Sequence, residues 1–193
     1  MTDRPQSPPV SFEDEPLILV DGDDRDLGFV AKAEAHRSPG RLHRALSVFV
    51  FRSDGALLLQ RRSAQKPLWP GFWSNSCCSH PRRGETVESA AHRRVREELG
   101  LTVPLDPVFS FEYRAAFEDR GVEHELCHVL VGRSDDAPML HEAEASASRY
   151  VHGDELDREL ATSAESYTPW LRLEWERLRR DHAATLTRLH VRG

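Results

Sequence analysis

The sequence predicts an α+β fold in which a mixed sheet, built largely from β-hairpins, packs against helices. Two apolar segments at residues 45–51 and 57–60, separated by a Ser-Asp-Gly turn, form the first expected hairpin. Residues 109–117 and 122–131 form a second hairpin around a turn at 118–121. Helical segments occur irregularly among these strands, without internal repeats or regular strand–helix–strand units. This order favours an α+β sandwich over a parallel α/β sheet.

Shorter segments complete the expected fold. Strands are expected at residues 17–20 and 148–151, and residues 61–84 read as a loop. A helix is expected at 87–99, because Thr86 is a good N-cap, apolar residues recur at helical spacing, and Gly100 can end the helix in the left-handed conformation. A short helix is expected at 154–160, and a long terminal helix from Pro169 to about residue 189.

Length and composition indicate a single domain. The chain has 193 residues, 39% hydrophobic and 30% charged, which is enough to bury a core. The proline-rich residues 1–16 are expected to form a disordered leader and residues 17–190 the folded domain. A net charge of −6 argues against nonspecific binding of nucleic acid.

The apolar runs and the cysteines bear on where the protein acts. The apolar runs are too short to cross a membrane, and the N-terminus lacks a signal pattern, so a cytoplasmic protein without a membrane partner is expected. Three cysteines, two of them adjacent, fit a reducing compartment better than a disulfide framework.

Residues 79–101 carry an informative motif. They read SHPRRGETVESAAHRRVREELGL, with Glu85 before the expected helix and Glu97 and Glu98 at its end. This segment resembles the Nudix box, G-x5-E-x7-R-E-U-x-E-E-x-G-U, where U is apolar. The resemblance implies a Nudix-type α/β/α sandwich whose helix carries carboxylates to a magnesium-bound diphosphate. Two positions depart from the pattern, because Ser79 replaces the first glycine and Arg94 replaces the first glutamate of the REUxEE segment.

The departure at Arg94 changes the expected chemistry. Arg94 and Glu98 are four residues apart and therefore share one face of the helix. A carboxylate there can hold Mg²⁺ and a guanidinium can clamp phosphate oxygens. The pair therefore predicts a diphosphate site that differs from that of an ordinary hydrolase. Taken without the rest of the motif, it is equally well read as a salt bridge on a solvated helix.

Three histidines and two glutamates form a second group of candidate ligands. His36 and His43 flank the turn at residues 38–40, and His80 lies further along the chain. Glu123 and Glu125 are two apart in an expected strand and so share one face. Three imidazoles and two carboxylates suit Zn²⁺, Mn²⁺ or Fe²⁺ better than the all-oxygen environment that Mg²⁺ prefers. Taken singly, each histidine is as well explained as a surface or hydrogen-bonded residue.

Segments around the box carry a more specific resemblance. In chain order they are RLH at residues 41–43, WPG at 69–71, SNSCCSHP at 74–81, EHELC at 123–127 and TPW at 168–170. Together they resemble the type 1 isopentenyl-diphosphate isomerases over about residues 17–178. The resemblance implies one divalent metal, Mn, Zn or Mg, at a site formed by the residues His36, His43, His80, Glu123 and Glu125.

The resemblance also implies a reaction, the interconversion of isopentenyl and dimethylallyl diphosphate in isoprenoid biosynthesis. A proton adds to the terminal alkene carbon and another leaves C2, so the path passes close to a tertiary carbocation and needs a donor, an acceptor and shielding from water. Glu125, hydrogen-bonded by Tyr113, is expected to deliver the proton. Cys78 is expected to remove the C2 proton as a thiolate, which a nearby positive charge would help to form. Trp170 is expected to face the cation.

The diphosphate is expected to be held by Mg²⁺ on Glu98 and by an anion clamp of four cations. By the same resemblance these cations are Lys32, Arg62, Lys66 and Arg94. The expected partner is therefore a small isoprenyl diphosphate, and the chain is expected to be a monomer or a weak homodimer.

Two other functions remain open at this level. A Nudix diphosphohydrolase acting on a nucleoside diphosphate derivative is disfavoured by Arg94, which removes a metal carboxylate, and by Cys78 with Glu125, which hydrolysis does not require. A noncatalytic zinc-stabilised module is disfavoured because structural zinc sites usually show paired C-x2-4-C spacing, whereas two of these cysteines are adjacent. The zinc ligands of such a module would be Cys77, Cys78, His80 and Cys127.

Overall fold

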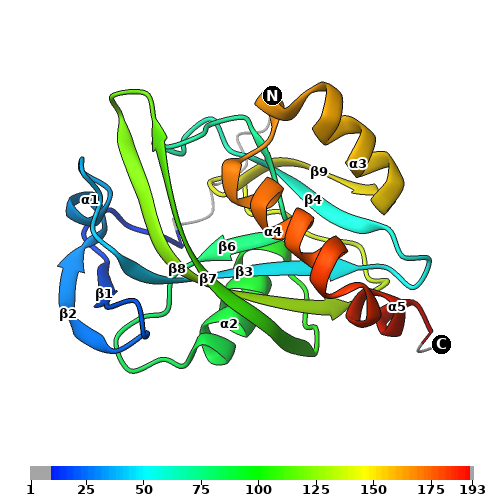
Figure 1. The fold of residues 1–193 in the computed structure, drawn as a ribbon, viewed down its shortest axis with the longest axis horizontal. Coiled ribbons are helices and arrows are strands. Elements are labelled where there is room, and N and C mark those ends of the chain that lie inside the picture. Colours follow the sequence, from blue (N-terminus) through cyan, green and yellow to red (C-terminus); the bar gives the residue numbers. More distant parts are fainter. Residues whose placement is uncertain (1–9, 192–193) are drawn as a thin grey trace, which may run out of the picture.

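The computed structural model describes residues 10–191, in which a nine-stranded mixed sheet is flanked by helices (Figure 1). The strands are β1 (Pro16–Val20), β2 (Asp26–Ala31), β3 (His43–Phe51), β4 (Leu57–Arg62), β5 (Trp73–Ser74), β6 (Cys77–Ser79), β7 (Leu105–Phe117), β8 (Gly121–Arg133) and β9 (Ala145–Val151). The helices are α1 (Lys32–Ala35), α2 (Val87–Leu99), α3 (Gly153–Thr162), the 3-10 helix η1 (Ala164–Ser166), α4 (Pro169–Asp181) and α5 (Ala183–Val191). The predicted α+β sandwich with a mixed sheet is confirmed.

Strand β3 organises the sheet. It pairs with β8 in parallel along its whole length, from His43 opposite Glu125 to Phe51 opposite Arg133. Because β8 occupies one edge of β3, the antiparallel partners β1, β6 and β4 follow one another along the other edge. Both predicted hairpins are present, β3–β4 with a single registered pair and β7–β8 with a long ladder.

Successive side chains of β3 point to opposite faces of the sheet and divide the core in two. Phe49 and Phe51 pack with Trp175 of α4, which lies across the near face of the sheet in Figure 1. Val48 and Val50 pack against α2 on the other face. The remaining odd-numbered positions of β3, which include His43 and Ser47, therefore face the α4 side.

Helix α2 forms as the sequence predicts. Thr86 is its N-cap, and the Thr86 hydroxyl accepts a hydrogen bond from the Ser89 amide at 3.1 Å. Gly100 ends the helix with φ 66°, a left-handed conformation that favours glycine. These two ends set the length of the helix and hence the position of Arg94 and Glu98 beneath the sheet.

Three sequence-based predictions of secondary structure are wrong. The long terminal helix is divided between α4 and α5, because His182 leaves the helical conformation (φ −125°, ψ 24°) and its ring stacks on Phe109 at 5.0 Å. The segment at 61–84 is not all loop, since β5 and β6 form within it. Strand β2 and helix α1 were not predicted; both are short and carry little periodic signal.

The described part of the chain begins within the expected leader. Of the leader expected at residues 1–16, residues 1–9 lie outside the described residues. Residues further on contact the domain, since Arg94 donates to the Val10 carbonyl and Lys32 to the Ser11 hydroxyl, both at 2.7 Å. Strand β1 begins at Pro16, the last residue of the expected leader. Within residues 10–191, no helix is long and apolar enough to span a membrane.

The cap of α2 gives a test of this part of the fold. Replacing Thr86 by alanine removes the acceptor for the Ser89 amide and should lower the free energy of unfolding by about 1 kcal/mol. Urea unfolding measures this change. Thr86→Ser, which keeps the hydroxyl, is the matched control and should stay close to the original protein; equal losses in both variants would contradict the capping role.

Candidate active site

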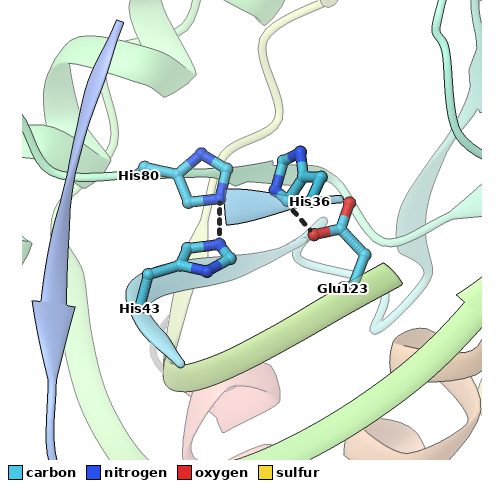
Figure 2. Close-up of side chains that lie close together, drawn as sticks. All are labelled: His36, His43, His80 and Glu123. Carbon is cyan, nitrogen blue, oxygen red and sulfur yellow. Dashed lines mark hydrogen bonds and ion pairs between the residues drawn. The ribbon is translucent and has the colours of Figure 1, made fainter. Parts of the chain in front are cut away.

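Four ligating side chains from distant parts of the chain meet on the α4 side of the sheet (Figure 2). His43 comes from β3 and Glu123 from β8. His36 follows α1, where its carbonyl accepts a hydrogen bond from the Val122 amide at 2.8 Å and so holds this turn against β8. His80 follows β6. All four are buried, and their ligand atoms lie within 4.8 Å of one another.

The nitrogen and oxygen atoms of this cluster that could bind a metal point toward one another, and some of them lack a hydrogen bond of good geometry. His43 Nε2 lies 3.2 Å from His80 Nε2, and His36 Nε2 lies 3.0 Å from Glu123 Oε2. His43 Nδ1 lies 2.7 Å from the Arg41 carbonyl, a contact that orients the ring with Nε2 toward the other members of the cluster. His36 Nε2 and Glu123 Oε2 are buried without a hydrogen bond of good geometry. A divalent cation could bind to all of these nitrogen and oxygen atoms at once, so the residues fit a metal site.

The charge states also suit a metal. Burial, followed by the charge of His43, lowers the pKa of His80 well below its ordinary value and keeps the ring neutral. Burial raises the pKa of Glu123, but the charge and hydrogen bond of His36 and the charge of His80 together outweigh burial, and the net shift is downward. Burial lowers the pKa of His36, but Glu123 and Glu125 together raise it above its ordinary value, so a bound metal would displace the His36 proton. Neutral imidazole and ionised carboxylate are the forms that bind metals.

Glu125 lies at the edge of the cluster, with Oε1 3.1 Å from His80 Nε2. Its Oε2 accepts a hydrogen bond from the Tyr113 hydroxyl at 2.7 Å. Burial raises the pKa of Glu125, but the interactions with His43, whose Nε2 lies 3.7 Å from Oε1, with Tyr113 and with His36 together outweigh burial, so the pKa is lowered. Burial and Glu125 together raise the pKa of Tyr113, which therefore stays a hydrogen-bond donor.

Cys78 lies opposite Ser47 in the β3–β6 pair. Its thiol donates to Asn75 Oδ1 at 2.8 Å, and Trp170 Nε1 donates to its sulfur at 3.1 Å. The Asn75 amide nitrogen donates to two carbonyls, which fixes its oxygen toward the thiol. Burial, followed by the charge of Glu174 once that group is ionised, raises the pKa of Cys78 to about 12.

Cys77 points away from this site. It is fully buried in the core beside α2, whereas Cys78 packs with Trp170 on the other face. This confirms the prediction that Cys77 is a packing residue. It also separates Cys77 from Cys78 and Cys127, so the four ligands of the alternative zinc module do not share one site.

A single cavity brings together most of the site residues predicted from the sequence. Its lining includes the four cations of the expected anion clamp, two of the three histidines, both strand glutamates and the aromatic residues. The lining residues are Ser11, Lys32, His36, Arg62, Lys66, Pro67, Leu68, Cys78, Ser79, His80, Arg94, Tyr113, Glu123, Glu125 and Trp170.

Two predicted residues lie behind the cavity wall. His43 has no exposed surface and forms the floor of the ligand cluster. Glu98 is also buried, and its oxygens accept from Arg94 at 2.7 Å and from Gln60 at 3.3 Å. Arg94 and Glu98 therefore share a helical face, as predicted.

Glu144 is a site residue that the sequence did not reveal. Its buried carboxylate pairs with Lys66 and, at 3.1 Å, with Arg94. Burial raises the pKa of Glu144, but Lys66 and Arg94 outweigh it and lower the pKa. The residue lies in an irregular segment before β9, where no periodic pattern or motif marks it. It connects two members of the anion clamp.

Comparison with known proteins agrees with this geometry. The NUDIX domain family matches residues 41–171, and a crystal structure from Deinococcus radiodurans superposes with a TM-score of 0.72 at 26% identity, covering 86% of this chain and all of that one. A MutT NUDIX hydrolase from Burkholderia pseudomallei shares the fold, with a TM-score of 0.57 and 20% identity over 70% of this chain and 97% of its own. The chain is therefore a Nudix protein.

Curated relatives define the family within this class. The isopentenyl-diphosphate Delta-isomerase of Nocardia farcinica is 48% identical over 81% of this chain and 90% of its own length. Isopentenyl-diphosphate Delta-isomerase 1 of Photorhabdus laumondii is 39% identical over 87% of this chain and 97% of its own. The chain belongs to the isopentenyl-diphosphate Delta-isomerase family.

The ligand cluster predicts a measurable metal affinity. His43→Gln should weaken Mn²⁺ binding on the order of tenfold or more, because it removes one of the converging donors. Isothermal titration calorimetry measures this, with circular dichroism to confirm folding. The matched control is His124→Gln, since His124 lies between Glu123 and Glu125 but pairs outward with Glu112. Equal affinities in the two variants would contradict the assignment.

Proposed function

We propose that this cavity interconverts isopentenyl diphosphate and dimethylallyl diphosphate, with Cys78 and Glu125 as the acid–base pair. The observation that carries the proposal is the enclosure of both groups, the ligand cluster and four cations by one cavity. An isoprenyl diphosphate has an anionic end and an apolar end that match these two kinds of lining. The family relationship supports the same reaction.

We propose the order of the proton transfers from the hydrogen bonds of the two groups. The Cys78 thiol donates to Asn75, whereas the Glu125 carboxylate accepts from the Tyr113 hydroxyl. In the direction toward dimethylallyl diphosphate, the Cys78 thiol then adds a proton to the terminal CH₂ carbon, which becomes a methyl group and leaves positive charge at C3. Glu125 takes the C2 proton, and the electrons of that C–H bond form the new double bond. This order is the reverse of the one that the sequence resemblance suggested.

Aromatic side chains would stabilise the positive charge between these two transfers. Trp170 is only 3% exposed, and its ring lies 6.3 Å from that of Tyr113. A desolvated cation over an aromatic face gains about 2 kcal/mol or more. Trp69 packs edge-on against Trp170 and helps to exclude water, which would otherwise capture the cation.

The cations would hold the diphosphate end. Arg62 is oriented by the Leu68 carbonyl at 2.8 Å, and Lys32 by Ser11. Lys66 and Arg94 are held by Glu144 and can exchange part of that contact for phosphate oxygens. Fixing the charged end places the small apolar end without many specific contacts.

The identity of the metal ions and the residues that would hold them are part of the proposal. A Mn²⁺, Zn²⁺ or Mg²⁺ ion held by the three histidines, Glu123 and Glu125 would supply positive charge that fixes Glu125. A Mg²⁺ ion bound through Glu98 would neutralise diphosphate charge. A cytoplasmic location and a monomeric or weakly dimeric state are also proposed, from the sequence alone.

A nucleoside diphosphate hydrolase is the second candidate. Arg94 stands where the hydrolase box has a metal-binding glutamate, and its guanidinium is occupied by Glu98 and Glu144. The cavity also contains a thiol that hydrolysis does not require. Both features favour the isomerase.

Proton NMR with isopentenyl diphosphate, Mn²⁺ and Mg²⁺ in D₂O tests the proposed reaction. Dimethylallyl diphosphate with deuterium in a methyl group should appear, and Cys78→Ala and Glu125→Gln should each abolish it. Cys77→Ala is the matched control and should retain turnover, because Cys77 is buried on the α2 side of the sheet, away from the cavity. Inorganic phosphate in place of the isomer, detected by ³¹P NMR of the same sample, would favour the hydrolase.

A further inference from the structure

Glu174 is a buried carboxyl group used by neither the ligand cluster nor the anion clamp. It lies on α4, one turn after Trp170, and has no exposed surface. Its Oε1 accepts from the Cys127 thiol at 3.4 Å, and Oε2 has no hydrogen-bond partner among the described residues. A buried carboxylate oxygen without a partner is costly, so these surroundings favour the neutral acid.

Ser47 connects Glu174 to Cys78. The Ser47 hydroxyl lies 3.4 Å from the Cys127 sulfur and 3.5 Å from the Cys78 sulfur. Ser47 also lies close enough to Glu174 to influence its ionisation. Helix α4 therefore reaches Cys78 in two ways, directly through Trp170 and indirectly from Glu174 through Ser47.

On the basis of the proposed function, we propose that Glu174 is a positioning residue for Cys78. Its neutral carboxyl group completes the hydrogen-bonded group with Cys127 and Ser47, which keeps the Ser47 hydroxyl beside the Cys78 sulfur. An ionised Glu174 would instead place a negative charge next to Cys78. That charge makes the thiol a weaker acid and slows proton transfer to an alkene.

The groups around Glu174 leave its charge uncompensated. Cys127 and Glu125 face it from β8 and Cys78 from β6, while β3 contributes the Ser47 hydroxyl. On β7, the Tyr113 hydroxyl is already bonded to Glu125. In the described part of the chain, no cation contributes to the shift in the pKa of Glu174, which burial raises to about 8.

Steady-state kinetics of two variants tests this role. Glu174→Gln keeps a neutral hydrogen-bonding group and should support turnover at neutral pH. Glu174→Leu has a similar volume but no hydrogen bonds, and should lower kcat on the order of tenfold or more through misplacement of Cys78. KM should change by less than about twofold in both, because the anion clamp is intact.

The pH profile separates positioning from general destabilisation. Below about pH 8 Glu174 is neutral and the wild-type kcat should be full, and kcat should fall as the pH rises through that value. Glu174→Gln cannot ionise and should lack this fall.

Three results would overturn the proposal. The first is a folded Glu174→Leu variant whose kcat equals that of the wild type. The second is a Glu174→Gln variant whose kcat falls at alkaline pH as much as that of the wild type. The third is a change in KM alone, with kcat unchanged, in Glu174→Leu. If Glu174→Leu does not fold, the pH profile of kcat for Glu174→Gln still tests the proposal. A wild-type protein that converts no isopentenyl diphosphate would overturn the proposed function and this proposal with it.

Discussion

The parallel pairing of β3 with β8 is the constraint on which the site depends. It sets His43 opposite Glu125 and Ala45 opposite Cys127. Because side chains alternate along a strand, one register fixes which polar groups share a face. A slip by one residue would turn His43 and Ser47 toward α2. The ligand cluster and the surroundings of Cys78 are therefore two consequences of the same pairing.

Strand β6, which pairs with the opposite edge of β3, carries the Cys78 thiol. Strand β6 is only three residues long, yet its pairing with β3 sends Cys78 toward α4 and Cys77 toward α2. Adjacent cysteines thus acquire opposite roles from strand geometry alone. Helix α4 then closes the face, since Trp170 contacts the Cys78 sulfur and Trp175 packs on Phe49 and Phe51.

Charges buried near α2 are balanced within the protein. Arg94 is 2% exposed and contacts Glu98 and Glu144, while Lys66 shares Glu144. Removing one member of such a group leaves an uncompensated buried charge, which is strongly destabilising. The same groups face the cavity that we assign to the diphosphate. We propose that the clamp is preorganised, because these ion pairs hold Arg94 and Lys66 at the cavity before a diphosphate binds.

Sequence patterns predicted the parts of this structure that local chemistry determines. Helix α2 was predictable because Thr86 and Gly100 mark its ends, and the motifs pointed to His43, His80 and Glu123. Contacts made through tertiary structure were not predictable. The stacking of His182 on Phe109 ends α4 early, and Glu144 and Glu174 gain their roles only when distant elements pack around them. The surroundings of Cys78 likewise depend on burial and on the contact with Asn75, which no sequence spacing reveals.

The central claim is that the histidines take the resident metal and leave Cys78 free to transfer protons. X-ray absorption spectroscopy of the zinc-loaded protein tests it most directly. We predict a shell of nitrogen and oxygen ligands with the multiple scattering of imidazole rings and no sulfur. A Zn–S distance near about 2.3 Å would contradict the account, because it would place a cysteine on the metal.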